Sequence, residues 1–337
     1  MSADGCDSSV ELALAVAAEI GEGPTWDEVT GTLLWVDILA GLIHRFDPSR
    51  GTDVMARIGC PVGSLGLRRR GGIVLALAHG FALASSEALD AALPPPRPSA
   101  RTRYNASLSG QARSDESRSA GKTGGFPPTL VTSPVEGFSV DTTQVRFNDG
   151  NVDPEGRFLA GTMHWFERSA LGSLYLLEPS GAVREVITDV IVSNGLAVSN
   201  DLRSLYYVDS PTGGVDIFDR NPDTGALSRR RRLIEIPRRE GSPDGLTLDA
   251  EGFLWVAIWG GGQVRRYSSG GRLDRTLRLP VSQVTSLVFG GPRYEDLFIT
   301  TARVGLSNSA LAEQPHAGDV FWAHPGMVGL PSALFAG

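Results

Sequence analysis

The sequence predicts an all-β protein, a six-bladed β-propeller of four-stranded antiparallel blades. Three observations indicate this fold: short apolar runs recur at a regular spacing, Gly and Pro are abundant, and no segment combines helical periodicity with capping residues. The 337 residues include 41 Gly and 21 Pro, as is typical of many short strands joined by turns. We expect a single propeller domain over residues 1–337.

The repeating unit is a turn containing Asp, Gly or Asn, followed by a short apolar run. The runs begin at positions 33, 73, 158, 205, 253 and 297, with spacings of 40, 85, 47, 48 and 44 residues. A propeller blade takes about 40–50 residues. The pattern therefore predicts six blades, one of which carries an insertion.

The insertion is predicted at residues 91–138, where Pro, Ser, Arg and Gly predominate. This composition buries little apolar surface and is typical of a flexible segment. If residues 129–131 are the outer strand of the second blade, the insertion is a hairpin loop on the face away from the site. If the outer strand precedes it, the insertion covers the channel mouth as a lid. We favour the first arrangement, and we do not expect use of the sequon at Asn105.

The alternating pattern of residues 10–16 predicts one further strand near the start of the chain. We expect it to pair with the last blade and close the ring, which removes free sheet edges.

Charge and composition exclude several classes of function. The formal net charge of −7 disfavours nucleic acid as a partner, and no apolar stretch of 18 residues predicts a membrane span. The acidic first twenty residues argue against a secretory signal, and Cys6 and Cys60 are too few for a disulfide framework. We expect a cytoplasmic monomer, and we interpret the basic run at 229–232 as a solvated strand face.

Polar residues occur in register across the repeats. Glu22, Asn148, Asn194 and Asp244 lie eleven residues before one residue of each run, namely Leu33, Leu159, Leu205 and Trp255, and each is followed closely by glycine. If each run is the second strand of its blade, these side chains lie near the start of the innermost strands and converge at one mouth of the channel. The other two blades place Ser64 and Ser286 near the corresponding point.

The converging groups are two carboxylates and two amides, which suit Ca²⁺, Mg²⁺ or Mn²⁺, with Zn²⁺ as a further option. Asn-Gly and Asp-Gly are also ordinary turn dipeptides, but four in register favour a site. Glycine beside each group permits close backbone approach or positive φ. Arg146 lies two residues before Asn148, so both side chains share one strand face, and a cation there suits a substrate oxygen or carboxylate.

At these residues the sequence resembles the regucalcin/gluconolactonase family, the senescence-marker-protein-like sugar lactonases. The matching stretches are residues 21–26, 146–163, 193–196 and 242–257, in the family's order, and the similarity covers most of residues 17–337 apart from the insertion. The resemblance implies one divalent cation held by Glu22, Asn194 and Asp244. It further implies that Arg146 and Asn148 contact the substrate, and that Asp244 is also the general base.

The reaction that the resemblance implies is hydrolytic opening of a sugar lactone, such as gluconolactone, to the aldonic acid. The chain departs from some relatives after Met163, where His164, Trp165, Phe166 and Glu167 replace a longer acidic loop that touches substrate. The choice of sugar is therefore left open. We interpret His164 as a packing residue rather than a pocket residue.

Three other functions are compatible with parts of this pattern. A non-catalytic calcium-binding regulator would use the same three ligands, and lactone hydrolysis with and without EDTA separates it from an enzyme. An organophosphate or ester hydrolase would prefer phosphotriesters in a substrate panel. A protein-interaction propeller predicts an uncharged channel mouth, which the four registered polar groups disfavour.

Overall fold

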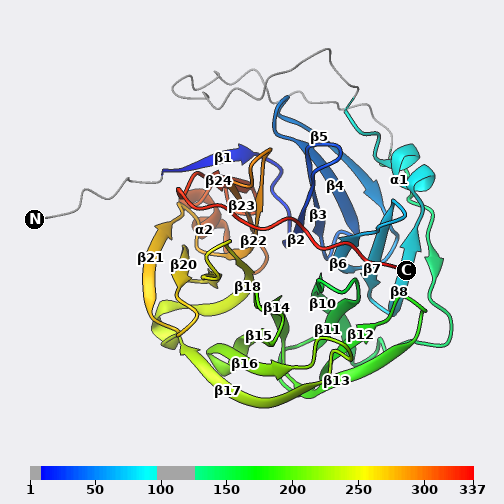
Figure 1. Ribbon diagram of the computed structural model, residues 1–337. Coiled ribbons are helices and arrows are strands. Elements are labelled where there is room, and N and C mark those ends of the chain that lie inside the picture. The colour runs from blue at the N-terminus through cyan, green and yellow to red at the C-terminus, as the bar shows by residue number, and fades with distance from the viewer. Residues whose placement is uncertain (1–8, 97–125) are drawn as a thin grey trace, which may run out of the picture.

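The computed structural model describes residues 9–96 and 126–337 as six four-stranded antiparallel sheets arranged around a central channel (Figure 1). The prediction of a six-bladed propeller is confirmed. All six apolar runs overlap the second strand of a blade, β3, β7, β11, β15, β19 or β23. The registered polar residues accordingly lie on the innermost strands, as the repeat spacing predicts.

The blades follow the chain in order, with the innermost strand first. Blade 1 contains β2 (Gly21–Asp27), β3 (Thr32–Asp37), β4 (Leu42–Asp47) and β5 (Thr52–Arg57), and blade 2 contains β6 (Val62–Leu67), β7 (Ile73–Leu77), β8 (Gly80–Ala84) and β9 (Ser133–Pro134). Blade 3 contains β10 (Val145–Val152), β11 (Phe158–His164), β12 (Gly172–Leu177) and β13 (Val183–Val190), and blade 4 contains β14 (Ser193–Val198), β15 (Ser204–Asp209), β16 (Gly214–Arg220) and β17 (Leu227–Glu235). Blade 5 contains β18 (Ser242–Leu248), β19 (Leu254–Trp259), β20 (Gln263–Tyr267) and β21 (Leu273–Arg278), and blade 6 contains β22 (Val284–Gly290), β23 (Asp296–Thr301), β24 (Val320–Ala323) and β1 (Val10–Leu14).

Strand β1 closes the ring, as its alternating sequence predicts. It pairs antiparallel with β24 as the outermost strand of blade 6. After β1, the backbone N–H groups of Val16 and Ala17 both donate to Asp319 Oδ1 at 2.8 Å. The first described strand thereby holds the last blade in place.

Two short α-helices contradict the expectation that no segment is helical. Helix α1 (Ser86–Ala92) is capped by the Ser85 side chain, and α2 (Asn308–Glu313) by Ser307. Each has at most two turns, which is too short for the apolar periodicity that identifies a helix in a sequence. Among the described residues, the 3₁₀ helix η2 (Ser210–Thr212) connects β15 and β16 within blade 4, and η3 (Arg238–Glu240) connects β17 of blade 4 to β18 of blade 5.

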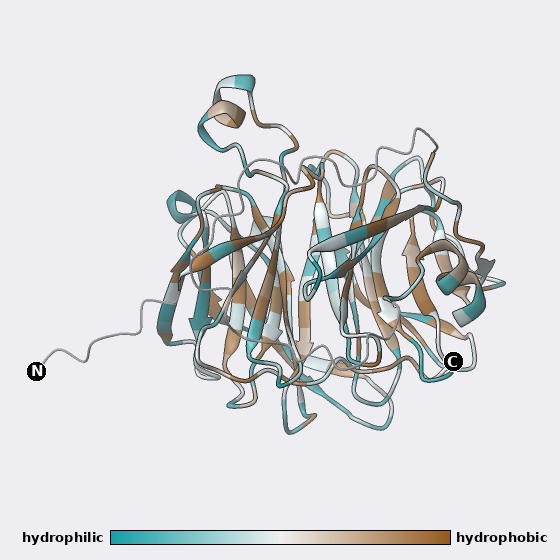
Figure 2. Ribbon diagram, turned by 90° about the horizontal axis from the view of Figure 1, so that it is seen from above, coloured by the Kyte–Doolittle hydropathy of each residue, from teal (hydrophilic) through white to brown (hydrophobic). Residues whose placement is uncertain are grey.

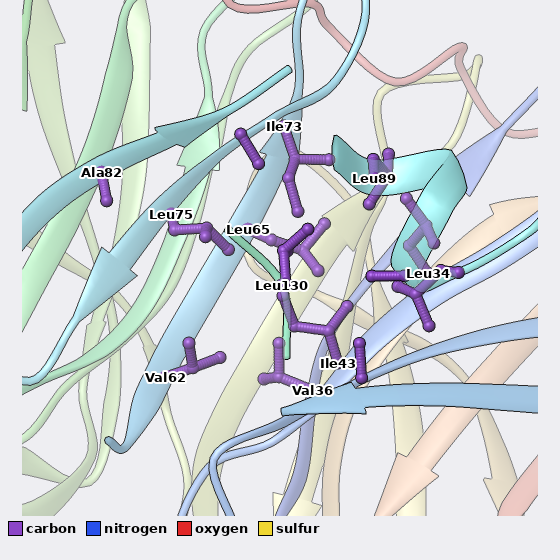
Figure 3. Close-up of a cluster of buried hydrophobic side chains, with 14 of the residues drawn as sticks. Leu34, Val36, Ile43, Val62, Leu65, Ile73, Leu75, Ala82, Leu89 and Leu130 are labelled. Atoms are coloured by element: carbon purple, nitrogen blue, oxygen red, sulfur yellow. The ribbon is translucent and has the colours of Figure 1, made fainter. Parts of the chain in front are cut away.

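The outer strand of blade 2 is β9, so its predicted position at residues 129–131 is wrong. Thr129 instead bridges Arg57 of blade 1, and the Leu130 N–H donates to the Arg57 carbonyl at 2.9 Å. Leu130 is 3% exposed and packs among leucine, isoleucine and valine side chains of blades 1 and 2 (Figure 3). Burial of this side chain between two blades, rather than pairing within blade 2, determines the path of the segment.

The predicted insertion at 91–138 begins in α1 and contains β9. Strand β9 lies near the C-terminal end of these bounds, so most of the insertion precedes the outer strand of blade 2, as in the arrangement we favoured. Helix α1 follows the end of β8 that lies away from the start of the innermost strands. Residues 97–125 of the insertion, with Asn105, lie outside the described part of the chain.

Hydrophobic side chains pack mainly between neighbouring blades. Each of the large clusters joins strands of adjacent sheets; in one, for example, the Trp26 ring of blade 1 stacks on the Phe298 ring of blade 6. The side view shows the hydrophobic colouring concentrated along the strands (Figure 2). Within residues 9–96 and 126–337, no helix is long and apolar enough to span a membrane.

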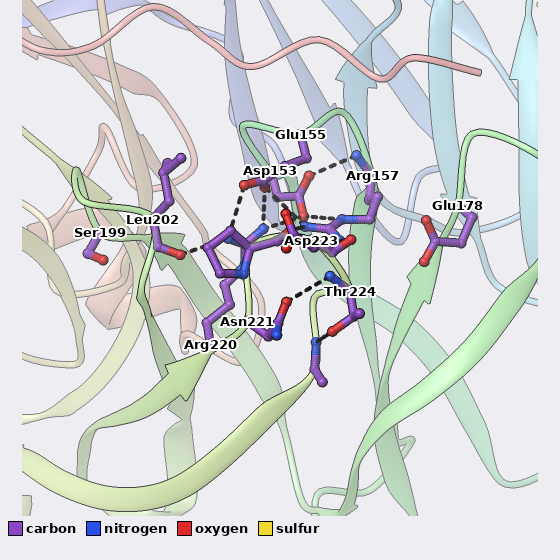
Figure 4. A network of polar contacts seen from close by, with 12 residues as sticks. Asp153, Glu155, Arg157, Glu178, Ser199, Leu202, Arg220, Asn221, Asp223 and Thr224 are labelled. Carbon is purple, nitrogen blue, oxygen red and sulfur yellow. Dashed lines mark hydrogen bonds and ion pairs between the residues drawn. The ribbon is translucent and has the colours of Figure 1, made fainter.

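A buried ionic cluster joins blades 3 and 4 on the face away from the starts of the innermost strands. The Asp153 carboxylate, which is 1% exposed, accepts from Arg157 Nε at 2.7 Å and from Arg220 Nη2 at 2.8 Å (Figure 4). Arg157 also donates to the backbone carbonyls of Pro222 and Asp223, while Glu155 pairs with both arginines. The cluster therefore fixes the β16–β17 turn of blade 4 on blade 3.

Replacing Asp153 tests how much this cluster stabilises the fold. Asp153→Asn leaves two buried guanidinium groups with only the partly exposed Glu155 as an acidic partner, and we expect a loss of about 3 kcal/mol in the free energy of unfolding. Asp223→Asn is the matched control, because Arg157 contacts only its backbone, and we expect a change of less than about 0.5 kcal/mol. Equal unfolding curves in guanidinium chloride for the two variants would contradict a stabilising role.

Candidate functional site

Five polar residues predicted from the sequence line one cavity of about 520 Å³: Glu22, Arg146, Asn148, Asn194 and Asp244. They come from the first half of four innermost strands, β2, β10, β14 and β18. All five are buried, with exposed fractions of 3 to 6%. The structure therefore brings the predicted groups together at one end of the channel.

A bulge directs these side chains toward the channel axis. In every blade, the pairing of the innermost strand with the second strand shifts register at the same point, for example between Glu22 and Thr25 in blade 1 and between Ser193 and Leu196 in blade 4. The shifts in the other four blades occupy the equivalent place. A bulge of this kind bends a strand and changes the direction of its side chains.

Glycine beside the bulge lets neighbouring innermost strands approach one another. A Cβ atom at Gly195 would lie 2.5 Å from the Asp244 carbonyl oxygen, and Gly23 has a φ of 53°. A side chain at Gly195 would push blades 4 and 5 apart, and a side chain at Gly23 would strain the backbone. The structure therefore shows both conformational roles expected of these glycines: close backbone approach at Gly195 and positive φ at Gly23.

Burial raises the pKa of the two carboxylates in the cavity. The pKa of Glu22 lies well above its usual range because of burial, and the nearby Asp244 and Asp149 carboxylates raise it further. The pKa of Asp244 is also raised well above its usual range, first by burial and then by Asp149 and Glu167. The site thus concentrates negative charge where little water is present, which a bound cation would neutralise.

Two oxygen atoms of the site lack a protein partner although they are buried: Asn194 Oδ1 and Asp244 Oδ1. The Asn194 amide is fixed by its Nδ2 group, which donates to Ser210 Oγ at 3.0 Å. Buried oxygen atoms without a partner are costly unless a ligand satisfies them. Together with the Glu22 carboxylate they form an oxygen-donor set that fits a hard divalent cation.

The donor set mixes carboxylates with an amide. In the described ranges, no group of three or more His, Cys, Asp or Glu side chains could hold a metal ion. The candidate donor set has two such side chains, Glu22 and Asp244, and its third protein donor is the side-chain carbonyl oxygen of Asn194.

Arg146 and Asn148 form a hydrogen-bonded pair beside these oxygens. Arg146 Nη1 donates to Asn148 Oδ1 at 2.8 Å, and Asn148 Nδ2 donates to the Ser193 carbonyl at 2.9 Å. The Trp165 ring centre lies 5.6 Å from the guanidinium carbon. Burial lowers the pKa of Arg146 to about 10, while Glu167 and Glu22 oppose this shift. Arg146 is therefore a cation at neutral pH.

Other residues of the cavity come from positions that the repeat pattern does not register. Met163, Ser210 and Trp259 lie at or just beyond the ends of second strands, and Glu167 and Arg238 lie in connecting loops. The sequence could have indicated Met163, Ser210 and Trp259, because an antiparallel second strand must end at the mouth where the innermost strand begins. His164 is absent from the cavity lining and accepts a hydrogen bond from the Phe166 N–H.

A narrower cavity of about 150 Å³ continues along the channel between the innermost strands. Asp149 and Ser286 line it, and burial raises the pKa of Asp149 to about 6. Residues 330–333 line its opposite end, where the C-terminal segment crosses the face of the propeller (Figure 1). The larger cavity therefore lies at the other end, opposite this segment.

Comparisons with known proteins agree with this architecture. A sequence model of the SMP-30/gluconolactonase/LRE-like region matches residues 20–303. Regucalcin of Xenopus laevis is 36% identical over 335 residues, which cover 97% of this chain and 98% of that protein. Regucalcin of Homo sapiens is 35% identical over 319 residues, 93% of each protein. A solved luciferin-regenerating enzyme aligns over 98% of this chain and 99% of its own, with a TM-score of 0.80 and 27% identity.

Replacing Glu22 tests whether the donor set is arranged for a cation. A carboxyl whose pKa is raised by folding destabilises the protein at pH values above its unfolded pKa. At pH 7.5 we therefore expect Glu22→Gln to raise the melting temperature of EDTA-treated protein by a few degrees. We also expect it to abolish the further rise that Ca²⁺, Mn²⁺, Mg²⁺ or Zn²⁺ produces in the unchanged protein.

Glu19→Gln is the matched control, because Glu19 is exposed and lies three residues from Glu22. Glu19→Gln removes the same negative charge. Its melting temperatures, after EDTA treatment and with added cation, should equal those of the unchanged protein. An undiminished response of Glu22→Gln to every cation would exclude Glu22 as a ligand.

Proposed function

The chain belongs to the SMP-30/gluconolactonase/LRE-like family, and we propose that it is a divalent-cation-dependent hydrolase that opens a sugar lactone to the aldonic acid. One observation carries the proposal: buried, unpartnered oxygens of Asn194 and Asp244 lie in the same cavity as Glu22 and the Arg146–Asn148 pair. The family's description includes gluconolactonase. Hydrolysis of a lactone, which is a neutral ester, requires a group that polarises its carbonyl and a base that activates water.

Glu22, Asn194 and Asp244 would hold the cation through oxygen atoms. When bound, a divalent cation would polarise the lactone carbonyl and favour deprotonation of water. Asp244 is the proposed general base: its carboxylate has two oxygen atoms, and the one that would not hold the cation is able to accept a proton from an attacking water.

Arg146 and Asn148 would bind and orient the substrate. Arg146 Nη1 is engaged by Phe147 O and Asn148 Oδ1, so Nε and Nη2 remain to donate to sugar oxygens. The contact with Trp165 restricts the guanidinium plane, which lowers the entropy lost when the substrate is positioned. The 520 Å³ cavity has room for a single sugar ring.

A panel of five- and six-membered sugar lactones tests the activity directly. We expect hydrolysis that is lost after EDTA treatment and restored by at least one of Ca²⁺, Mn²⁺, Mg²⁺ and Zn²⁺. Cation binding without hydrolysis of any lactone would instead support a regulatory calcium-binding protein, and hydrolysis of phosphotriesters alone would support an organophosphate hydrolase.

The role of Asp244 is tested by Asp244→Ala. We expect kcat for the best lactone to fall by about 10²–10⁴-fold, the range for loss of a general base. Ser64→Ala is the matched control, because Ser64 is a buried polar residue near the corresponding point of the innermost strand in blade 2 but does not line the cavity, and its kcat should change less than about threefold. Full turnover by Asp244→Ala would refute the assignment of the base.

We further propose that the protein acts as a cytoplasmic monomer on a small molecule, without nucleic acid or membrane as a partner. The net charge of −7 supports the exclusion of nucleic acid. Sedimentation of the purified chain would measure its oligomeric state.

A further inference from the structure

Arg238 is an exposed cation on the wall of the cavity. It begins the 3₁₀ helix η3, between the outer strand of blade 4 and the innermost strand of blade 5. Arg238 Nη2 donates to the Pro211 carbonyl at 3.4 Å, which places the guanidinium over the η2 turn. Ser210, Gly213 and Trp259 line the same cavity.

No carboxylate pairs with Arg238 among residues 9–96 and 126–337, although acidic groups are close in sequence. Glu240 is engaged by the other two arginines of this region, Arg239 at 3.3 Å and Arg265 at 2.8 Å. Arg238 is therefore the arginine of η3 whose charge is left without a counter-ion, and it is also the one that lines the cavity.

Once a cation is bound, no acidic group of the cavity lining is left to compensate the positive charge of Arg238. A divalent cation would neutralise Glu22 and Asp244, and the remaining acidic group of the lining, Glu167, is balanced by Arg146. The charge of Arg238 then has no partner in the cavity. In a protein with a net charge of −7, such a local cation is what makes the approach of an anion favourable.

We propose that Arg238 binds an anionic substituent of the substrate, a carboxylate or phosphate distant from the reacting lactone carbonyl. The inference rests on the proposed lactonase function and specifies its substrate class: sugar lactones that carry a negative charge. The planar guanidinium donates two parallel hydrogen bonds to either anion. Arg238 is then a specificity-determining residue, and its removal alters substrate preference rather than the chemical step.

The test compares kcat/KM for a neutral lactone with values for two charged ones. The substrates are gluconolactone, its 6-phosphate and glucarolactone, which distinguish phosphate from carboxylate. We expect the unchanged protein to prefer at least one charged lactone. Arg238→Ala should lower kcat/KM for that lactone by about 10- to 30-fold, as for loss of a charge-assisted hydrogen bond, and change the value for gluconolactone less than about threefold.

Two further variants separate recognition from general charge effects. Arg238→Lys keeps the charge but loses the two-pronged geometry, so it should retain part of the preference. Arg239→Ala removes an equal charge one residue away, outside the cavity lining, and should keep the full preference. The preference should also weaken as NaCl is raised from about 0.05 to 0.5 M, because the guanidinium is exposed.

Calorimetric binding of the sugar acids keeps the inference testable without turnover. Gluconate, 6-phosphogluconate and glucarate are titrated into cation-loaded protein and its Arg238→Ala variant. If no lactone is hydrolysed but a charged acid binds more tightly than gluconate through Arg238, the proposed function fails and the anion site stands. Equal binding of all three acids, or an equal loss for all three in Arg238→Ala, overturns the role of Arg238.

Discussion

The structure depends on the convergence of six innermost strands on one axis. At that radius there is little room, so the strands approach closely only where glycine replaces a side chain, as at Gly195 beside the Asp244 carbonyl. The same crowding accompanies a bulge at the equivalent point of every blade. Bulge and glycine together direct Glu22, Asn194 and Asp244 at one another, so the geometry of the ring creates the donor set.

Burying these carboxylates side by side opposes folding, and other parts of the propeller offset the cost. Hydrophobic clusters lie between adjacent blades, β1 closes the ring on β24, and the Asp153 cluster fastens blade 3 to blade 4. These contacts lie outside the cavity. The rigid frame can therefore hold unpartnered oxygens in a polar site that would be unstable in isolation.

The repeat spacing was sufficient to predict the fold and the inner ring, because residues in register on equivalent strands must face a common axis. It was not sufficient for features that break the repeat. Residues 129–131 have the composition of a strand, but burial of Leu130 between blades places them beside Arg57. Glu167 and Arg238 lie in connections with no counterpart in register, so only the fold shows that they reach the cavity.

The cavity accordingly has two parts under different constraints. The inner ring is set by strand pairing, and a change there disturbs the contact between neighbouring blades, as a side chain at Gly195 would. The wall is built from η2, η3 and the loop after β11, which carry Ser210, Arg238 and Glu167. Because loops tolerate substitution better than packed strands, the wall can change its charge while the ring is preserved. Under the proposed function, cation binding would therefore depend on the propeller frame, whereas substrate preference would depend mainly on these three connections.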